Sequence, residues 1–160
     1  MENSKRLLAG LSAMVMLATT TGSLVFAEDT TSETGEVLVS SDFESDLGGF
    51  TPRMNEGQSV EVSVVNDGNA HNGDGYLLCT NREKSWQGAQ FLTDGILEGG
   101  KKYLVNAWVK TPWYATVTLS IQYTDSTGSV HYENVENVVS QGDWAELSNV
   151  KVQIPADCTE

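Results

Sequence analysis

Apolar and polar residues alternate in several short stretches of the chain. In the segment 59–65, Val60, Val62 and Val64 alternate with polar residues, and the segment 116–124 carries apolar residues at every odd position. A period of two predicts strands with one buried face, and no stretch shows helical periodicity of useful length. The predicted strands cover residues 37–43, 59–65, 76–80, 103–110, 116–124, 130–139 and 144–154.

Segments rich in Gly, Asn and Asp separate these stretches. Residues 66–75 (NDGNAHNGDG) predict a dense turn, and residues 125–128 (DSTG) predict a hairpin turn of the longer type. Short strands separated by such turns are typical of an all-β sandwich. Residues 37–160 have the length of one domain with a substantial core. We therefore predict a single β-sandwich.

The first 36 residues have a different character. A basic start at Lys5 and Arg6 precedes a mostly apolar stretch, and Val25 and Ala27 form a small-x-small cleavage site. This order predicts a secretory signal peptide over residues 1–27, and hence a secreted, extracellular protein. A membrane anchor is the alternative, although no stop-transfer pattern follows. Residues 28–36 are acidic and rich in Thr and Ser, which predicts a flexible lead-in.

Charge and cysteine content narrow the possible partners. The chain has 22 acidic and 9 basic residues, for a formal net charge of −13. Such a surface argues against nucleic acid and anionic membranes as partners, and it suits a neutral ligand. The two cysteines, Cys79 and Cys158, are compatible with a disulfide after export, or with Cys79 as a buried free thiol.

A tryptophan in a polar loop is the first candidate for ligand binding. Trp86 lies in the segment 80–90 (TNREKSWQGAQ), between two short apolar runs. An amphipathic ring at the edge of a site suits a ligand with an apolar face and several hydroxyl groups, such as a sugar. The alternative is that Trp86 folds back onto the core beneath its loop.

Two neighbouring predicted strands offer a second set of candidates on the face opposite the apolar one. This face carries hydroxyl and amide groups and an aromatic ring, which are the groups that stack on a glycan and form hydrogen bonds with it. An ordinary solvated sheet face is the alternative. The residues are Thr118, Ser120 and Gln122 on one strand, and Tyr132, Asn134 and Glu136 on the other.

Catalytic and metal-binding patterns are sparse. His71 and His131, the only two histidines, have neither a metal-ligand spacing nor a nucleophile motif beside them. A glycosidase needs one carboxyl group in an apolar environment that raises its pKa, and no acidic residue has such neighbours in the sequence. Asp42 and Glu44 flank Phe43 and have the oxygen ligands that a hard cation prefers, or they are solvated charges.

Several separate motifs follow one another along the chain: TPR (51–53), NRxxxWQGAQ (81–90), GKKY (100–103), LSIQYTDSTGSVHYENV (119–135), WAELSN and IPADCTE. In this order they resemble the carbohydrate-binding modules of family 22, the xylan-binding modules attached to bacterial endo-1,4-β-xylanases. The similarity runs from about Val37 to the end of the chain. It implies a β-jelly-roll sandwich with a cleft on one sheet that binds single xylan chains.

The resemblance also implies roles for particular residues. The family's cleft arginine, tryptophan and strand tyrosine correspond to Arg53, Trp86 and Tyr132. A structural Ca²⁺ would use Glu44, with Asp42 as a further candidate. Phe50 stands where the family commonly has tryptophan. The family's remaining cleft tyrosine and glutamate belong to a closing strand beyond residue 160, so we expect this module to lack its C-terminal strand.

The sequence thus predicts a non-catalytic module that binds xylan or a related β-1,4-linked polysaccharide. It would hold an attached endo-1,4-β-xylanase, in the same full-length chain, near the plant cell wall. A small glycoside hydrolase and a cell-surface adhesion module of the same fold are the alternatives. Trp113 and Tyr114 would extend the cleft or cap the core. Further cleft-lining candidates are Gln90, Gln122, Asn134 and Glu136.

Overall fold

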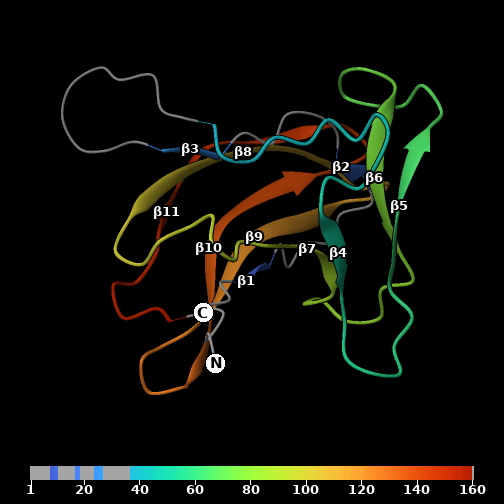
Figure 1. Ribbon diagram of the computed structural model, residues 1–160. Coiled ribbons are helices and arrows are strands. Elements are labelled where there is room, and N and C mark those ends of the chain that lie inside the picture. The colour runs from blue at the N-terminus through green and yellow to red at the C-terminus, as the bar shows by residue number, and fades with distance from the viewer. Residues whose placement is uncertain (1–7, 11–16, 19–23, 27–36, 160) are drawn as a thin grey trace.

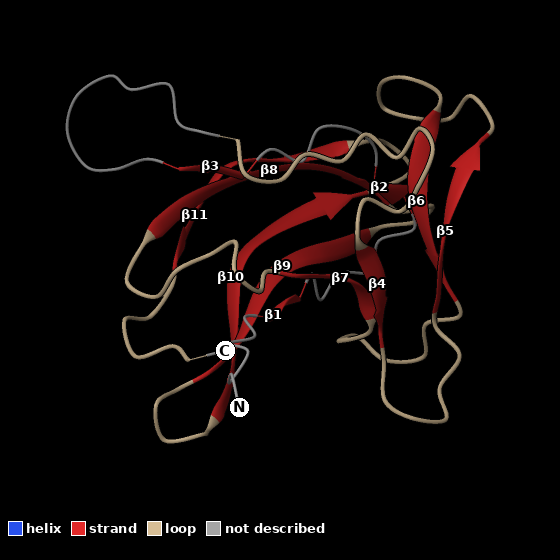
Figure 2. Ribbon diagram, in the orientation of Figure 1, coloured by secondary structure: helices blue, strands red, loops and turns tan. Residues whose placement is uncertain are grey.

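The computed structural model describes residues 8–10, 17–18, 24–26 and 37–159. All regular secondary structure in these residues is β-strand (Figure 2). The described part of the chain accordingly has no helix that is long and apolar enough to span a membrane. The strands form two sheets that pack as two layers (Figure 1), which confirms the predicted all-β sandwich.

The first sheet, which carries the candidate site, has five strands in the order β10-β9-β1-β7-β4. The second sheet has the order β11-β8-β2-β6-β5, with β3 also paired to β8. The strands of the first sheet are β1 (Leu8–Gly10), β4 (Phe50–Arg53), β7 (Gly88–Leu92), β9 (Ala115–Thr124) and β10 (Val130–Ser140). Those of the second are β2 (Leu17–Ala18), β3 (Leu24–Phe26), β5 (Glu61–Asn66), β6 (Gly75–Thr80), β8 (Lys102–Lys110) and β11 (Ala145–Gln153).

The alternating pattern correctly predicts which face of β9 is buried. On β9 the odd-numbered positions enter the core, and the even-numbered ones face outward. β8 and β11 contribute the opposite wall of the same core. The largest cluster of buried apolar residues lies between these three strands: Leu97, Tyr103, Val109, Val117, Leu119, Ile121, Tyr123, Leu147, Val150, Val152 and Ile154.

Register shifts interrupt the alternation at two places. The pairing of β10 with β9 shifts between Asn134 and Glu136, and the pairing of β11 with β8 shifts between Leu147 and Val150. An extra residue at a bulge reverses which face the following residues occupy. The second shift explains why Leu147 and Val150 are both buried, although three positions separate them.

The structure corrects the predicted first strand. Residues 37–43 form no strand; Phe43 is buried with a φ of 56° and ends an irregular segment. A strand that the pattern did not predict, β4, follows shortly after, and among the described strands it pairs only with β7. Pro52 lies within it, which an edge strand tolerates because one side of its backbone needs no partner.

The prediction of a signal peptide and lead-in falls largely on residues outside the described ranges. The parts that are described are three short strands. β1 pairs with both β7 and β9, β2 pairs with β6 and β8, and β3 pairs with β8. The strand at the centre of the first sheet therefore comes from the segment predicted as a signal peptide.

Of the two cysteine alternatives, the structure has the buried thiol. Cys79, on β6, is 1% exposed and is not disulfide-bonded, so no bridge joins it to Cys158. Burial raises the pKa of this thiol, against the opposing effect of the Arg82 charge. Cys79 packs in a second, smaller core cluster with Phe43, Val60, Leu77 and Ala89.

Candidate functional site

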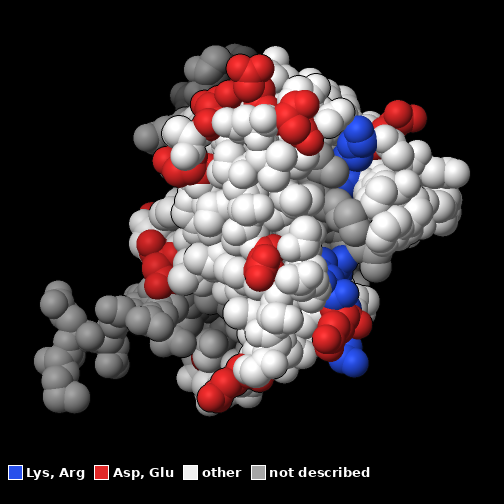
Figure 3. Space-filling model, turned by 90° about the vertical axis from the view of Figure 1, so that its right-hand side faces the viewer, with Lys and Arg blue, Asp and Glu red and all other residues white. Residues whose placement is uncertain are grey.

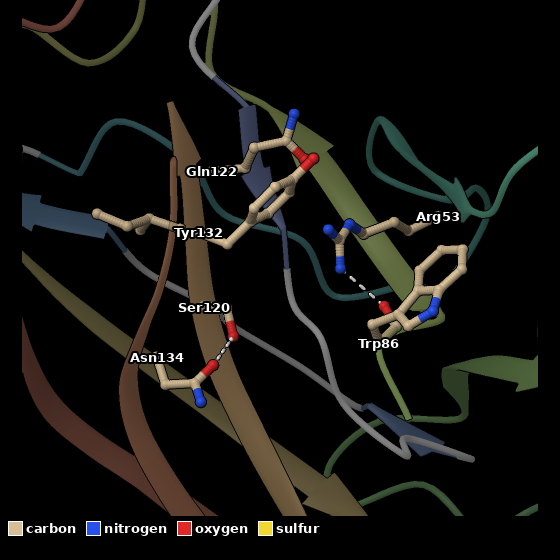
Figure 4. Close-up of a pocket in the computed structure, with 7 residues that line it drawn as sticks. Arg53, Trp86, Ser120, Gln122, Tyr132 and Asn134 are labelled. Carbon is tan, nitrogen blue, oxygen red and sulfur yellow. Dashed lines mark hydrogen bonds between the residues drawn. The ribbon is translucent and has the colours of Figure 1, made fainter. Parts of the chain in front are cut away.

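A small open pocket lies on the outward face of the first sheet (Figure 4). Its volume is about 140 Å³. One wall comes from β4 and the loop before β7, and the other comes from the β9–β10 hairpin. The lining residues are Arg53, Trp86, Ser120, Ile121, Gln122, Tyr132 and Asn134.

Arg53 links the two walls. Its guanidinium carbon lies 5.5 Å from the centre of the Trp86 ring and 5.4 Å from that of the Tyr132 ring. Nη1 donates a 2.8 Å hydrogen bond to the backbone carbonyl of Trp86. Figure 4 shows Arg53 and Tyr132 reaching toward each other from opposite sides. Desolvation lowers the pKa of Arg53, yet a guanidinium remains charged at neutral pH. The pocket thus holds one cation between two aromatic rings.

The loop that carries Trp86 is built around two polar side chains. The guanidinium of Arg82 donates to the carbonyls of Lys84, Ser85 and Gln87. The side-chain oxygen of Gln87, which is 0% exposed, accepts from the backbone N–H groups of Glu83 and Lys84. Because these bonds satisfy the loop backbone from within, the loop has a defined shape before any ligand binds. Trp86 is half-buried and belongs to neither core cluster. Its side chain lines the pocket, which excludes the alternative of a core tryptophan.

Two hydrogen-bonded side-chain pairs continue the hairpin wall. Ser120 Oγ donates to Asn134 Oδ1 at 2.9 Å, and Thr118 Oγ1 donates to Asn137 Oδ1 at 2.6 Å. Both pairs join directly opposite positions of β9 and β10. The amide groups are thereby oriented, so the outward face of the hairpin presents ordered polar groups beside the pocket.

The structure brings together five of the seven predicted sugar-binding residues, and two lie elsewhere. Gln90 is on the same sheet face, but its amide points to Thr51 at 3.4 Å and does not line the pocket. Glu136 follows the register shift and stands opposite the core residue Leu119. The alternation that placed Glu136 beside Asn134 is therefore wrong at this position, and Asn137 takes the next place on the outward face.

Sequence reasoning named the motif containing Arg82 and Gln87 but gave neither residue a role. Several polar residues around a half-buried tryptophan in a short loop indicate that the loop needs internal hydrogen bonds. Ile121 also lines the pocket, although its side chain belongs to the core. No pattern predicts such a dual contact.

Asp42 and Glu44 lie far from this pocket, near the turn between β5 and β6. Glu44 Oε1 accepts from the backbone N–H groups of Asp74 and Gly75 at 2.9 and 3.2 Å. Asp42 Oδ1 accepts from the N–H of Glu44. Among the described residues no group of three or more His, Cys, Asp and Glu side chains is placed to hold a metal ion. Ca²⁺ takes six to eight oxygen ligands, so these two carboxylates alone do not complete a site.

The surface charge is uneven. On the face shown in Figure 3 the acidic side chains are spread widely, whereas the few Lys and Arg side chains lie along one side. Of the residues that line the pocket, only Arg53 is charged. A pocket of rings, amides, hydroxyls and one cation is suited to a neutral ligand with many hydroxyl groups.

The fold and the pocket together define a β-sandwich module with an open site for a neutral polyhydroxylated ligand. The sequence profile of the carbohydrate binding domain family matches residues 35–157, and the chain belongs to this family. The first sheet and the pocket lie almost wholly within the matched residues, apart from β1.

Relatives and solved structures agree with this assignment. Endo-1,4-β-xylanase A of Thermotoga maritima is 35% identical over 130 residues, which cover 78% of this chain and 12% of the relative. Endo-1,4-β-xylanase Y of Acetivibrio thermocellus is 28% identical, over 74% of this chain and 11% of the relative. A solved xylan-binding domain of family 22 superposes with a TM-score of 0.64 at 27% identity, covering 74% of this chain and 76% of that domain. The chain therefore corresponds to about an eighth of these xylanases and to most of the solved module, and the family 22 resemblance is confirmed.

Proposed function

We propose that this chain is a non-catalytic module that binds single chains of xylan or a related β-1,4-linked polysaccharide. The observation that carries the proposal is the pair of rings, Trp86 and Tyr132, on opposite walls of an open pocket with Arg53 between them. The solved xylan-binding domain of family 22 and the xylanases among its relatives support the choice of ligand.

Each side chain of the pocket makes a different contact with the sugar. The Trp86 ring stacks on the apolar face of one xylose unit, because its loop holds it at the rim before binding. Arg53 has five N–H donors, of which one is committed to the Trp86 carbonyl, and the others are available to sugar hydroxyls. Tyr132 is 64% exposed and stacks on the sugar or donates to it from the other wall. Gln122 and Asn134 add amide contacts beside it.

Binding to soluble xylan and to microcrystalline cellulose tests this ligand class. A crystal surface requires a flat row of aromatic rings, whereas this pocket has two walls that take a single chain. We expect retardation in affinity electrophoresis on soluble xylan and little pull-down on microcrystalline cellulose. Equal or stronger binding to cellulose would refute the proposal. Release of reducing sugar from xylan by the chain itself would favour the glycoside hydrolase alternative.

We also propose that the module serves an endo-1,4-β-xylanase within a longer secreted chain. The xylanases it resembles are about eight times as long as the matched region, which supports a catalytic domain elsewhere in the same chain. Cleavage after Ala27 would remove the signal peptide and release the mature protein outside the cell. Mass spectrometry of the secreted protein tests this point; a mature N-terminus at Glu28 is expected, and retention of residues 1–27 would refute it.

β1 lies within the predicted signal peptide, so cleavage would remove it from the first sheet. We propose that a strand following Thr159 then takes its place between β9 and β7. The backbone N–H of Thr159 donates to the Thr124 carbonyl at 2.8 Å, and Cys158 forms an antiparallel bridge with Asp125. The chain thus enters the first sheet on the side of β9 where Leu8 pairs with Gln122. Residues 28–160 alone should lack a cooperative melting transition that a longer chain has; a cooperative transition together with full xylan affinity would refute this.

Calcium binding stays a prediction of the family resemblance. Glu44 holds the β5–β6 turn by accepting two backbone hydrogen bonds. If Asp42 and Glu44 contribute to a Ca²⁺ site, calcium should raise the melting temperature of the secreted protein and a chelator should lower it. No shift in either direction would mean that the two carboxylates act only through their hydrogen bonds.

A further inference from the structure

Two consecutive aromatic residues stand in solvent at one end of the β9–β10 hairpin. Trp113 and Tyr114, in the loop between β8 and β9, are 52% and 66% exposed. This excludes the expectation that they cap the core. Single exposed apolar residues are common, but adjacent exposed rings form a contact surface that water solvates poorly.

The loop that carries these rings is fixed from beneath by buried polar groups. Thr111, which is 0% exposed, donates from its backbone N–H to Ser140 Oγ at 2.9 Å and from Oγ1 to the Ser140 and Trp113 carbonyls at 3.0 and 2.7 Å. The Gly142 N–H donates to the Thr111 carbonyl at 2.7 Å. The backbone under the rings is therefore ordered, and contact with a ligand costs little further loop entropy.

A row of outward-facing positions joins this loop to the pocket. Starting at the pocket, successive opposite pairs on β9 and β10 are Gln122–Tyr132, Ser120–Asn134, Thr118–Asn137 and Thr116–Val139. Within each of the two middle pairs the two side chains are hydrogen-bonded, and Asn134 and Asn137 remain exposed. Ala115, the first residue of β9, directly follows Tyr114 in the chain. The outward face of the hairpin thus runs from an aromatic ring, over amides and hydroxyls, to an aromatic pair.

The size of the pocket requires a polysaccharide to continue beyond it. Its volume of about 140 Å³ is well below the roughly 300–1,000 Å³ of clefts that enclose a drug-sized ligand, so a polysaccharide in it extends past its walls. From Gln122 to Thr116 the strand advances about 20 Å at roughly 3.3 Å per residue, a distance that spans several sugar units. The polar row offers hydrogen bonds over that whole distance.

We propose that Trp113 and Tyr114 form a second contact platform for the same polysaccharide chain that occupies the pocket. The platform binds a sugar unit several positions away from the one stacked on Trp86, so only a long ligand reaches both. This inference rests on the proposed function, because it takes the ligand of the pocket as given. It makes the module selective for chain length through two separate contacts on one chain.

Titration calorimetry on the full-length secreted protein, with any attached xylanase domain inactivated so that the ligand stays intact, tests the platform with two ligands, a xylose trisaccharide and long soluble xylan. In the double variant Trp113→Ala/Tyr114→Ala we expect trisaccharide affinity within twofold of the parent and xylan affinity lower by about fivefold to tenfold. Because both rings are exposed, the melting temperature should stay unchanged. Val130→Ala removes an equally exposed apolar side chain, 48% exposed, from the other end of β10 and should change neither affinity.

Three outcomes are distinguishable. If the double variant binds long xylan as tightly as the parent, the platform is refuted. The pocket proposal is tested separately by Trp86→Ala, which should lower the affinity for both ligands. If the double variant loses affinity for both ligands equally, the rings act through the pocket or the fold, and the platform is again refuted. If the parent binds neither ligand, the proposed function itself fails, and the platform fails with it.

Discussion

Both outward faces of the sandwich carry a basic side chain over aromatic rings, but only on the second sheet does a loop of the protein cover the rings. On the first sheet Arg53 sits over Trp86 and Tyr132, and the space between the walls is open. On the second sheet Lys110 sits 5.8 Å over the Trp144 ring, and Trp108 lies next to it. There, however, the turn between β5 and β6 covers the rings.

The turn between β5 and β6 covers these rings through defined contacts. The His71 ring stacks on Trp108 with centroids 3.7 Å apart and rings inclined by 16°, and the Trp144 Nε1–H donates to the Asn69 carbonyl. Glu44 fixes the other end of the same turn by accepting from two backbone N–H groups. The comparison shows that an aromatic ring next to a cation does not make a ligand site. Whether the protein's own loop already occupies the ring decides its role.

The largest effect should come from Trp108→Ala on the covered face. The substitution removes the surface on which His71 stacks, and large-to-small changes of a buried tryptophan typically cost about 3–5 kcal/mol. Because Trp108 is half-buried, we expect a loss of about 2 kcal/mol in the free energy of unfolding, with unchanged xylan affinity. Denaturant titration and affinity electrophoresis give the two quantities. A loss of xylan binding without a loss of stability would contradict this view of the covered face.

Trp86→Ala should have the opposite signature. Aromatic anchors dominate small sites, so we expect xylan affinity to fall about tenfold or more, which corresponds to roughly 1.4 kcal/mol. The free energy of unfolding should change little, because the ring lies at a loop rim outside both core clusters. A drop in stability as large as that of Trp108→Ala, with affinity preserved, would make Trp86 a structural residue.

The internal hydrogen bonds of the Trp86 loop should matter next. Gln87→Leu keeps the apolar volume but removes the oxygen that accepts from the Glu83 and Lys84 N–H groups. We expect xylan affinity to fall about threefold to tenfold, because the loop then orders only on binding. Gln87→Glu retains the acceptor and replaces the Gln87 amide nitrogen, which is buried without a hydrogen-bond partner, by a second oxygen.

Calorimetric titration of both Gln87 variants therefore separates loop order from simple packing. The Glu variant should bind as the parent does, and the Leu variant should bind more weakly. Similar losses in the two variants would show that the acceptor oxygen does not position Trp86.

The smallest effect should come from Lys110→Met. A cation over a ring at a partly exposed site contributes about 0.5 kcal/mol, so the melting temperature should drop slightly and xylan affinity should not change. The matched change on the open face, Arg53→Met, removes a similar contact together with the N–H donors to sugar. It should lower xylan affinity severalfold. Equal affinities for both variants would mean that Arg53 contributes nothing to xylan binding, either as a donor to sugar or through its bond to the Trp86 carbonyl.

The sequence pattern was sufficient for the core and for most of the pocket. Period-two alternation on β9 placed Leu119 and Ile121 inside and Ser120 and Gln122 outside, because a strand has only two faces. It was insufficient wherever the period broke. Glu136 was misplaced because a single extra residue in β10 changes the face, and no local signal in residues 134–136 announces a bulge.

The sequence by itself determined that the chain is an all-β sandwich, that Trp86, Tyr132 and Arg53 are candidates for sugar contact, and that its motifs belong to a carbohydrate-binding family. Only the tertiary structure decided that these three residues meet, since they lie on β4, a loop and β10, which long-range strand pairing brings together. It also decided which aromatic residues remain available to a ligand. Trp108 is covered and Trp113 is exposed because a loop from a distant part of the chain packs on the first and not on the second.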